Sequence, residues 1–171
     1  MTATLTIQEL EVRYGETVAL TGVDLELPAG SSLAVIGPNG SGKSTLLNAI
    51  AGINPPFAGT ISWGGDAPAL VLQSTSVDRS LPITVRDTVG LGRYPRLGLL
   101  RRFNGTDGGA VAQAMERLDI TDLTGEQLHD LSGGQRQRVL VAQGLAQQSD
   151  LLLLDEPVTG LDVTSRGLIL D

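Results

Sequence analysis

The sequence predicts an α/β fold in which an antiparallel β layer at the N-terminus leads into a core built on a parallel sheet. Leu5–Tyr14 alternates apolar and polar residues imperfectly and Val23–Leu27 does so cleanly, which is typical of strands with one face in water. Further along, the apolar residues form continuous runs, as in parallel strands covered on both faces. These runs are Leu33–Ile36, Leu70–Leu72 and Leu151–Leu154.

The elements between these strands follow from turn and helix signals. Pro28-Ala29-Gly30 predicts a turn, and Leu46–Ala51 has the apolar spacing of a helix. Thr60–Trp63 and Ala69–Gln73 predict short strands around a Gly-Gly pair, and a helix is expected around Thr84–Gly92.

Two more helices are expected in the second half of the chain. The first is capped by Asp107 and runs to Leu118, with Val111, Ala114 and Met115 on one face. Before it, the sequence GTDGG at 105–109 is the most linker-like point. The second helix is capped by Ser132 and runs from Gly133 to about Gln147.

The composition excludes several classes of protein. The chain has 171 residues, which suffices for one domain with its own core, and a net charge of −7, which argues against broad binding to nucleic acid. It has no cysteine, so it has no disulfide and no thiolate metal site. The N-terminus lacks the features of a secretory signal, and no apolar run approaches the roughly 18 residues that span a bilayer.

A phosphate-binding loop follows the apolar run at 33–36. The residues Gly37-Pro38-Asn39-Gly40-Ser41-Gly42-Lys43-Ser44-Thr45 fit the pattern G-x-x-x-x-G-K-[ST]. The glycines let successive N–H groups point into one concavity at the start of a helix, which favours an anion. Lys43, the only lysine of the chain, is expected to reach the β- and γ-phosphates, and the Ser44 hydroxyl to hold Mg²⁺.

A second anion site is predicted at Leu131-Ser132-Gly133-Gly134-Gln135, ahead of the amphipathic run Arg136–Ala146. A Ser hydroxyl and Gly N–H groups there stand at a helix N-terminus. Taken alone, the segment is equally consistent with an ordinary Ser-capped helix, and the phosphate loop upstream favours the anion site.

The apolar run at 151–154 ends in Asp155-Glu156-Pro157. A carboxylate at the end of a strand can hold Mg²⁺ through water, as expected of Asp155. Glu156 beside it is the expected catalytic residue, which orients and deprotonates an attacking water. The plainer alternative is a strand that ends at a solvated acidic turn. This alternative accounts easily for one acidic residue and poorly for the full pattern with two.

With GPNGSGKST, LSGGQ and LLLLDEP in that order, the chain resembles the ABC-type ATPases, the nucleotide-binding subunits of ATP-binding-cassette transporters. The resemblance covers essentially the whole chain, and LSGGQ separates this family from other phosphate-loop NTPases. It implies a phosphate-loop NTPase core with a RecA-like parallel sheet, an N-terminal antiparallel β layer and an inserted α-helical subdomain. Residues 1–171 would form one ABC ATPase domain, with 1–75 and 150–171 as the core and 76–149 as the helical subdomain.

The resemblance also implies roles for three further residues. Tyr14 matches the aromatic residue that stacks on adenine, and Gln73 matches the glutamine that contacts Mg²⁺ and senses the membrane partner. Asp162 matches a loop that contacts the opposite subunit. The plainer alternatives are a strand-end tyrosine, a polar residue that ends a strand, and a helix N-cap.

In this family ATP and Mg²⁺ are the cofactors, and two subunits face each other head to tail. The Ser132–Gln135 segment of one subunit closes over ATP held by the Gly37–Thr45 loop of the other. The implied partners are a second ATPase subunit, a membrane-spanning subunit and an extracellular substrate-binding protein, with no nucleic acid. The implied location is the cytoplasmic face of the cell membrane.

The resemblance also implies a cargo, and this inference rests on Ser76–Phe103, the stretch expected to contact the membrane partner. Leu81–Asp87 and Gly92-Arg93-Tyr94 look like the importers of manganese and zinc, and iron–siderophore importers are similar here. A soluble ABC protein acting on DNA or ribosomes is disfavoured, because the interval between the phosphate loop and LSGGQ is short, the charge is acidic and only one cassette is present.

The sequence departs from the family pattern at its end. Family members continue through a further strand that carries a histidine for the γ-phosphate, and no residue here takes that role; His129, the only histidine, precedes LSGGQ. The expectation is therefore a copy incomplete at the C-terminus, which binds nucleotide weakly and hydrolyses it poorly or not at all. A non-hydrolysing nucleotide-binding remnant remains the alternative to an active ATPase.

Overall fold

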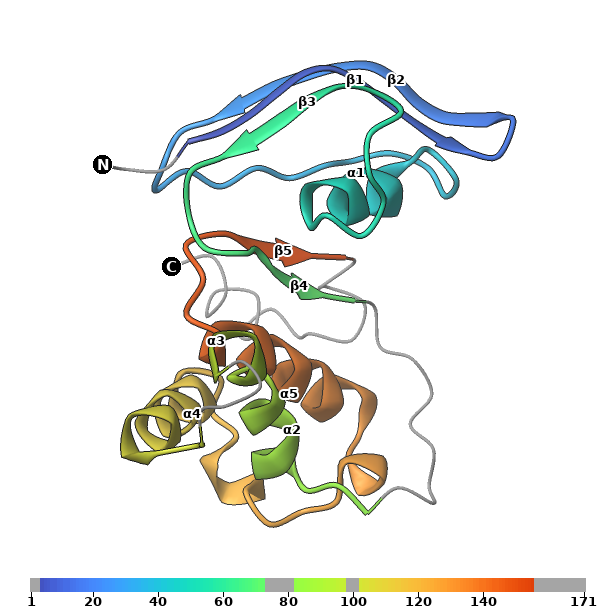
Figure 1. The fold of residues 1–171 in the computed structure, drawn as a ribbon. Coiled ribbons are helices and arrows are strands. Elements are labelled where there is room, and N and C mark those ends of the chain that lie inside the picture. Colours follow the sequence, from blue (N-terminus) through green and yellow to red (C-terminus); the bar gives the residue numbers. More distant parts are fainter. Residues whose placement is uncertain (1–3, 73–81, 98–101, 156–171) are drawn as a thin grey trace. The chain divides into compact units, whose positions relative to one another are not determined.

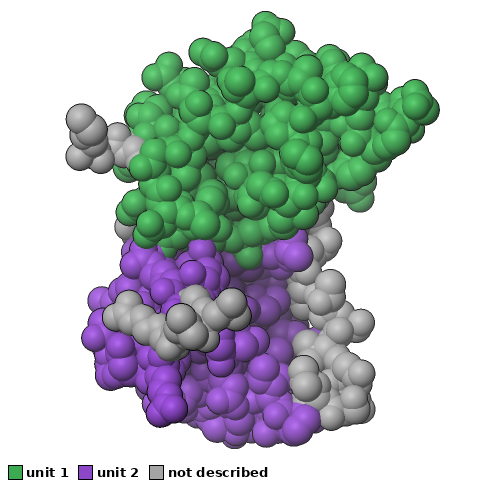
Figure 2. All heavy atoms as spheres, in the orientation of Figure 1, with its two compact units in different colours: residues 1–70, 149–155 green, residues 71–148, 156–171 purple. Residues whose placement is uncertain are grey.

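A computed structural model describes residues 4–72, 82–97 and 102–155. The chain divides into two compact units, of which unit 1 is Met1–Leu70 with Ser149–Asp155 and unit 2 is Val71–Gln148 with Glu156–Asp171 (Figure 2). The assignment of the whole chain to one ABC ATPase domain stays a prediction.

Unit 1 contains a three-stranded sheet in the order β2-β1-β3 (Figure 1). The strands are β1 (Leu5–Tyr14), β2 (Thr17–Leu27) and β3 (Ala58–Trp63), and both β2 and β3 pair antiparallel with β1. The predicted antiparallel layer is therefore confirmed.

The imperfect alternation in β1 has a structural cause. Leu5 and Ile7 are buried at odd positions, whereas Leu10 and Val12 are buried at even ones. The pairing with both neighbouring strands shifts in register after this first pair, and Glu9 has a φ of 48°. A β-bulge there turns the second half of the strand so that both halves face the same core.

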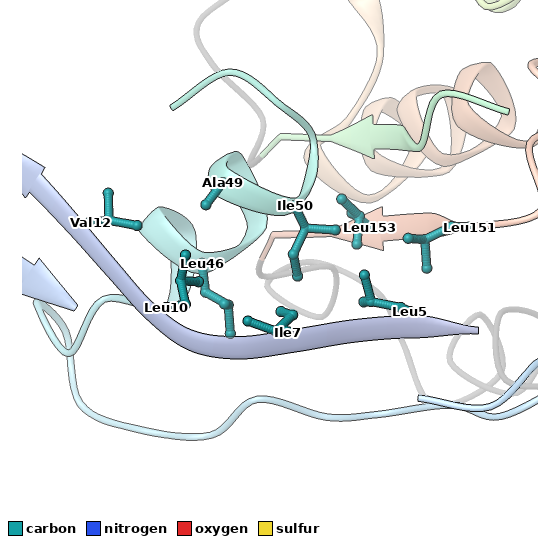
Figure 3. Packing of buried hydrophobic residues seen from close by; sticks show 9 residues of the cluster. All are labelled: Leu5, Ile7, Leu10, Val12, Leu46, Ala49, Ile50, Leu151 and Leu153. Atoms are coloured by element: carbon teal, nitrogen blue, oxygen red, sulfur yellow. The ribbon is translucent and has the colours of Figure 1, made fainter. Parts of the chain in front are cut away.

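The core of unit 1 lies between β1 and a helix. The helix α1 (Lys43–Ile50) buries Leu46, Ala49 and Ile50. Figure 3 shows these side chains beside the inward face of β1, together with Leu151 and Leu153 from the C-terminal segment of unit 1.

A second sheet has two strands, β4 (Ala69–Val71) and β5 (Leu152–Leu154). Their arrows run in the same direction in Figure 1, and the Ala69 N–H donates to the Leu151 carbonyl at 2.9 Å. These strands form the parallel part of the predicted α/β core.

The strand expected at Leu33–Ile36 is not formed. Residues 31–38 have irregular backbone, and Leu33, Val35 and Ile36 are exposed. Neither described sheet includes this segment, so its backbone groups have no ladder partner among the described residues. An apolar run predicts burial, but the strand forms only when a neighbouring strand pairs with it.

Unit 2 is helical in its described part. Its main helices are α2 (Val85–Leu91), α3 (Tyr94–Leu97), α4 (Gly105–Arg117) and α5 (Gly133–Ala146), joined by the short 3₁₀ turns η1 (Thr121–Leu123) and η2 (Leu128–Asp130). Helices α2 and α4 both pack on α5. No helix of the described ranges is long and apolar enough to span a bilayer.

The cap of α4 differs from the prediction. Asn104, not Asp107, is the N-cap, and its side chain accepts from the N–H groups of Thr106 and Asp107. The Asp107 carboxylate in turn accepts from the Asn104 N–H, which completes a capping box. The linker-like GTDGG sequence therefore forms the first turn of the helix. The predicted apolar face of Val111, Ala114 and Met115 is buried as expected.

Candidate phosphate-binding site

The phosphate loop leads directly into α1. Gly42 is the N-cap of this helix and has a φ of 92°. A Cβ at this position would lie 2.5 Å from Leu20 Cδ2 and 3.2 Å from the Ala19 carbonyl oxygen. Only glycine therefore fits both the backbone conformation and the space beside β2.

Lys43 turns back over the loop that precedes it. Its Nζ donates to the carbonyl oxygens of Gly37 and Pro38, both at 3.0 Å. The loop is narrow here, because a Cβ on Gly37 would lie 2.7 Å from Ser41 Oγ. A positive charge and the N–H groups at the helix start thus lie together in one short loop, a combination that favours the binding of a phosphate group.

Tyr14 lies beside the same helix, although it is far away in sequence. Its hydroxyl donates to Thr45 Oγ1 at 3.4 Å and accepts from Asn54 Nδ2 at 2.7 Å. The residue is 51% exposed, so its ring is open to solvent at the end of β1. The structure thus brings an aromatic ring and the phosphate loop together within unit 1.

Asn54 was not predicted as part of this site. It lies in a loop after α1 and belongs to none of the three motifs. The only signal in the sequence is its place shortly after the helix-ending Ala51-Gly52 pair, which does not by itself indicate what its side chain contacts.

The predicted Mg²⁺ ligands are described only in part. Ser44 is exposed in the first turn of α1, and Asp155 is partly buried directly after β5. Both present the hard oxygen atoms that Mg²⁺ prefers, and Mg²⁺ typically takes only one or two protein ligands beside the phosphates. The described ranges hold no cluster of three or more His, Cys, Asp or Glu side chains placed to hold a metal. Gln73, Glu156 and Asp162 lie outside the described residues.

The second predicted anion site lies at the start of α5 in unit 2. Ser132 caps the helix: its Oγ accepts from the Gln135 N–H at 3.3 Å, and Gln135 Oε1 accepts from the Ser132 N–H at 2.9 Å. Ser132 and Gly133 are exposed, and a Cβ on Gly133 would meet no atom of the described residues within 4 Å. Because the Ser132 hydroxyl accepts in the cap, its own proton is still available for donation.

The chain is similar to ATP-binding proteins of ABC transporters. The family model described as "ABC transporter" matches residues 20–159. The manganese transport system ATP-binding protein MntB of Listeria monocytogenes is 40% identical, over 96% of this chain and 71% of its own length. The hemin import ATP-binding protein HmuV of Streptomyces coelicolor is 42% identical, over 94% of this chain and 60% of its own length.

A solved structure agrees with these sequence matches. It shows an inward-facing conformation of a metal-chelate type ABC transporter and aligns with a TM-score of 0.86 and 33% identity. The alignment covers 99% of this chain and 66% of the solved one.

Proposed function

Because the chain belongs to the ABC transporter family of ATP-binding proteins, we propose that it binds and hydrolyses ATP to energise an importer, and that the cargo is a divalent metal ion, manganese or zinc. The observation that carries the ATP-binding part is the position of Lys43 Nζ, held by the carbonyls of Gly37 and Pro38 in the narrow loop before α1. A fixed cation at a helix N-terminus is the arrangement that binds the end of a nucleoside triphosphate.

Each part of the nucleotide has a partner in the chain. Residues 37–45 would hold the phosphates, with Lys43 on the β- and γ-phosphates, and the ring of Tyr14 would stack on adenine. Ser44, Asp155 and Gln73 would hold Mg²⁺, which supplies charge neutralisation on the phosphate oxygens. Glu156 would orient and deprotonate the attacking water.

The second anion site suggests a second subunit. Ser132 and Gly133 are exposed at the start of α5, and Gly134 and Gln135 beside them are partly buried. We infer that this segment covers the γ-phosphate of ATP held by a facing copy, so that ATP joins two subunits head to tail. The further partners would be a membrane-spanning subunit and an extracellular substrate-binding protein, which places the protein at the cytoplasmic face of the membrane.

The choice of cargo is supported by the similarity to MntB, a manganese transport protein. A chelated-iron or hemin importer is the second candidate, since HmuV is similar to a comparable degree. The residues of an ATPase do not touch the cargo, so transport by the complete complex has to distinguish these candidates.

Two substitutions test the ATPase. Lys43→Ala is expected to lose ATP binding, whereas Glu156→Gln is expected to keep ATP binding and to lose turnover by about 100-fold or more. Glu116→Gln, an exposed change on α4, is the matched control and should leave both unchanged. Unchanged ATP affinity in Lys43→Ala would contradict the proposal.

The cargo is tested in the complex with its membrane-spanning subunit. ATP turnover in vesicles is expected to rise with Mn²⁺ or Zn²⁺ delivered by the substrate-binding protein and not with hemin. Stimulation by hemin alone would reverse the assignment.

A further inference from the structure

The side chain of Asn54 is fixed on the hydroxyl of Tyr14. Asn54 Nδ2 donates to this hydroxyl at 2.7 Å, and the hydroxyl donates onward to Thr45 Oγ1 at 3.4 Å. The three groups therefore form a series of hydrogen bonds that joins the loop after α1, the end of β1 and the first turn of α1.

The position of Asn54 is set by the way α1 ends. Gly52 has a φ of 76°, its N–H donates to the Ala49 carbonyl at 3.0 Å, and the Ile53 N–H donates to the Asn48 carbonyl at 2.9 Å. This is a Schellman motif, which reverses the chain in a fixed geometry. Asn54 is the next residue, and its own N–H also reaches the Asn48 carbonyl at 3.3 Å.

We propose that Asn54 is a positioning residue for adenine binding: it holds the ring of Tyr14 at the place where the ring stacks on the base. This inference rests on the proposed function, in which Tyr14 is the adenine-stacking residue. The residue is 51% exposed, so core packing holds only part of it, and the hydrogen bond to its hydroxyl fixes the position of the far end of the ring. Holding the ring in advance removes part of the entropy cost of ordering it when the nucleotide binds.

In this proposal the two ends of α1 position groups for the two parts of the nucleotide, the phosphates and the base. The first residue of the helix, Lys43, lies in the phosphate loop, and its C-terminal turn delivers Asn54 to the aromatic platform. Loss of the Asn54 bond should therefore weaken the recognition of the base and leave that of the phosphates unchanged. A purely structural role would weaken both.

The test is a double-mutant cycle on the 171-residue chain, with ATP and inorganic tripolyphosphate as the two ligands. Asn54→Leu and Tyr14→Phe each remove one side of the bond and keep the size of the side chain. Each is expected to weaken ATP binding by about three- to tenfold and to leave tripolyphosphate binding unchanged. The double variant should bind ATP no more weakly than the weaker single variant.

Controls separate this inference from the proposed function. Tyr94→Phe removes a hydroxyl from the other tyrosine, on α3 of unit 2, and should not change ATP affinity. Three results would overturn the role of Asn54 and leave the proposed function standing. They are wild-type ATP affinity in both Asn54→Leu and Tyr14→Phe, additive losses in the double variant, and an equal loss of tripolyphosphate binding. A wild-type chain that binds neither ligand, or a Lys43→Ala variant that binds both normally, would overturn the proposed function and this inference together. If Asn54→Leu fails to fold, Tyr14→Phe with the two ligands decides the question.

Discussion

Arg93 and Asp107 form a buried ion pair in unit 2, with Nε 3.0 Å from Oδ1 and both residues no more than 5% exposed. Arg93 Nη1 also donates to the carbonyl of Ala146 at 2.7 Å and to Gln148 Oε1 at 3.0 Å. One guanidinium thus joins the start of α4 to the end of α5, the helix whose other end carries the Ser132 cap. A cation at the C-terminus of a helix also opposes the negative end of its dipole.

Arg93→Ala is expected to lower the free energy of unfolding by about 3–5 kcal/mol, measured by urea denaturation. The reason is that the Asp107 carboxylate would stay buried and lose its ion pair with Arg93. The double variant Arg93→Met with Asp107→Leu should lose less stability than Arg93→Ala, because it removes both charges of the pair. Arg13→Ala, which breaks the more exposed pair with Glu11, should cost about 1 kcal/mol or less. Equal urea midpoints for Arg93→Ala and Arg13→Ala would refute the importance of the buried pair.

Two glycines near the end of α2 provide a matched pair for packing. A Cβ on Gly92 would lie 2.0 Å from the Gln143 carbonyl oxygen in α5, whereas a Cβ on Gly90 would meet, among the described residues, only Phe103 Cε2 at 3.9 Å. Gly92→Ala should therefore force the helices apart and lower the free energy of unfolding by about 1–3 kcal/mol. Gly90→Ala should be neutral or stabilising by up to about 1 kcal/mol, since alanine favours a helix. Thermal unfolding of the two variants checks this, and the opposite order would contradict it.

Gly42→Ala should abolish ATP binding. The new Cβ would both strain a φ of 92° and overlap the side chain of Leu20, so the loop would have to move. Gly30→Ala is the control, because this residue has a φ of 74° but a Cβ added to it would meet nothing within 4 Å in the part of the chain that the structure describes. The control should lose only about 1–2 kcal/mol of stability and keep its ATP affinity. The measurements are ATP titration and thermal unfolding, and wild-type ATP affinity in Gly42→Ala would show that the loop tolerates the change.

Substitutions at Ser132 separate its capping role from its proposed role at a facing subunit. Asn and Asp cap helices about as well as Ser, so both variants should unfold near the wild-type temperature. Ser132→Asp adds a negative charge where the γ-phosphate of a facing copy is proposed to bind, and it should prevent ATP-dependent dimerisation. Ser132→Asn is neutral and should weaken dimerisation less.

Light scattering with Glu156→Gln as the background, which slows hydrolysis, measures this association. ATP-dependent dimers of equal affinity in the Asp and wild-type chains would place Ser132 away from the phosphate.

Much of the site was predictable because it is local in sequence. The phosphate loop, the capping box at Ser132 with Gln135, and the strand that precedes Asp155 each depend on residues within a few positions of one another. The alternation of β1 also predicted its inward face, apart from the bulge at Glu9. Such features depend on interactions between residues that are close in sequence, so the sequence alone predicts them.

Other features needed partners that are distant in the chain. Leu33–Ile36 has the composition of a buried strand, but it stays irregular because no described strand pairs with it. Asp107 has the chemistry of an N-cap, yet it serves instead as the third residue of a capping box and as the partner of Arg93. Composition indicates what a residue can do, and the available neighbour decides which of these options is used.

The sequence by itself determined the phosphate loop, the Ser132 cap of α5 and the family of this protein, because each rests on residue types at fixed short spacings. Only the tertiary structure decided that Asn54 donates to the Tyr14 hydroxyl, and that Arg93 binds both the Asp107 carboxylate and the carbonyl at the end of α5. These contacts join residues 14 to 53 positions apart, and the physical reason is that hydrogen bonds and ion pairs depend on proximity in space, which the packing of helices and strands creates.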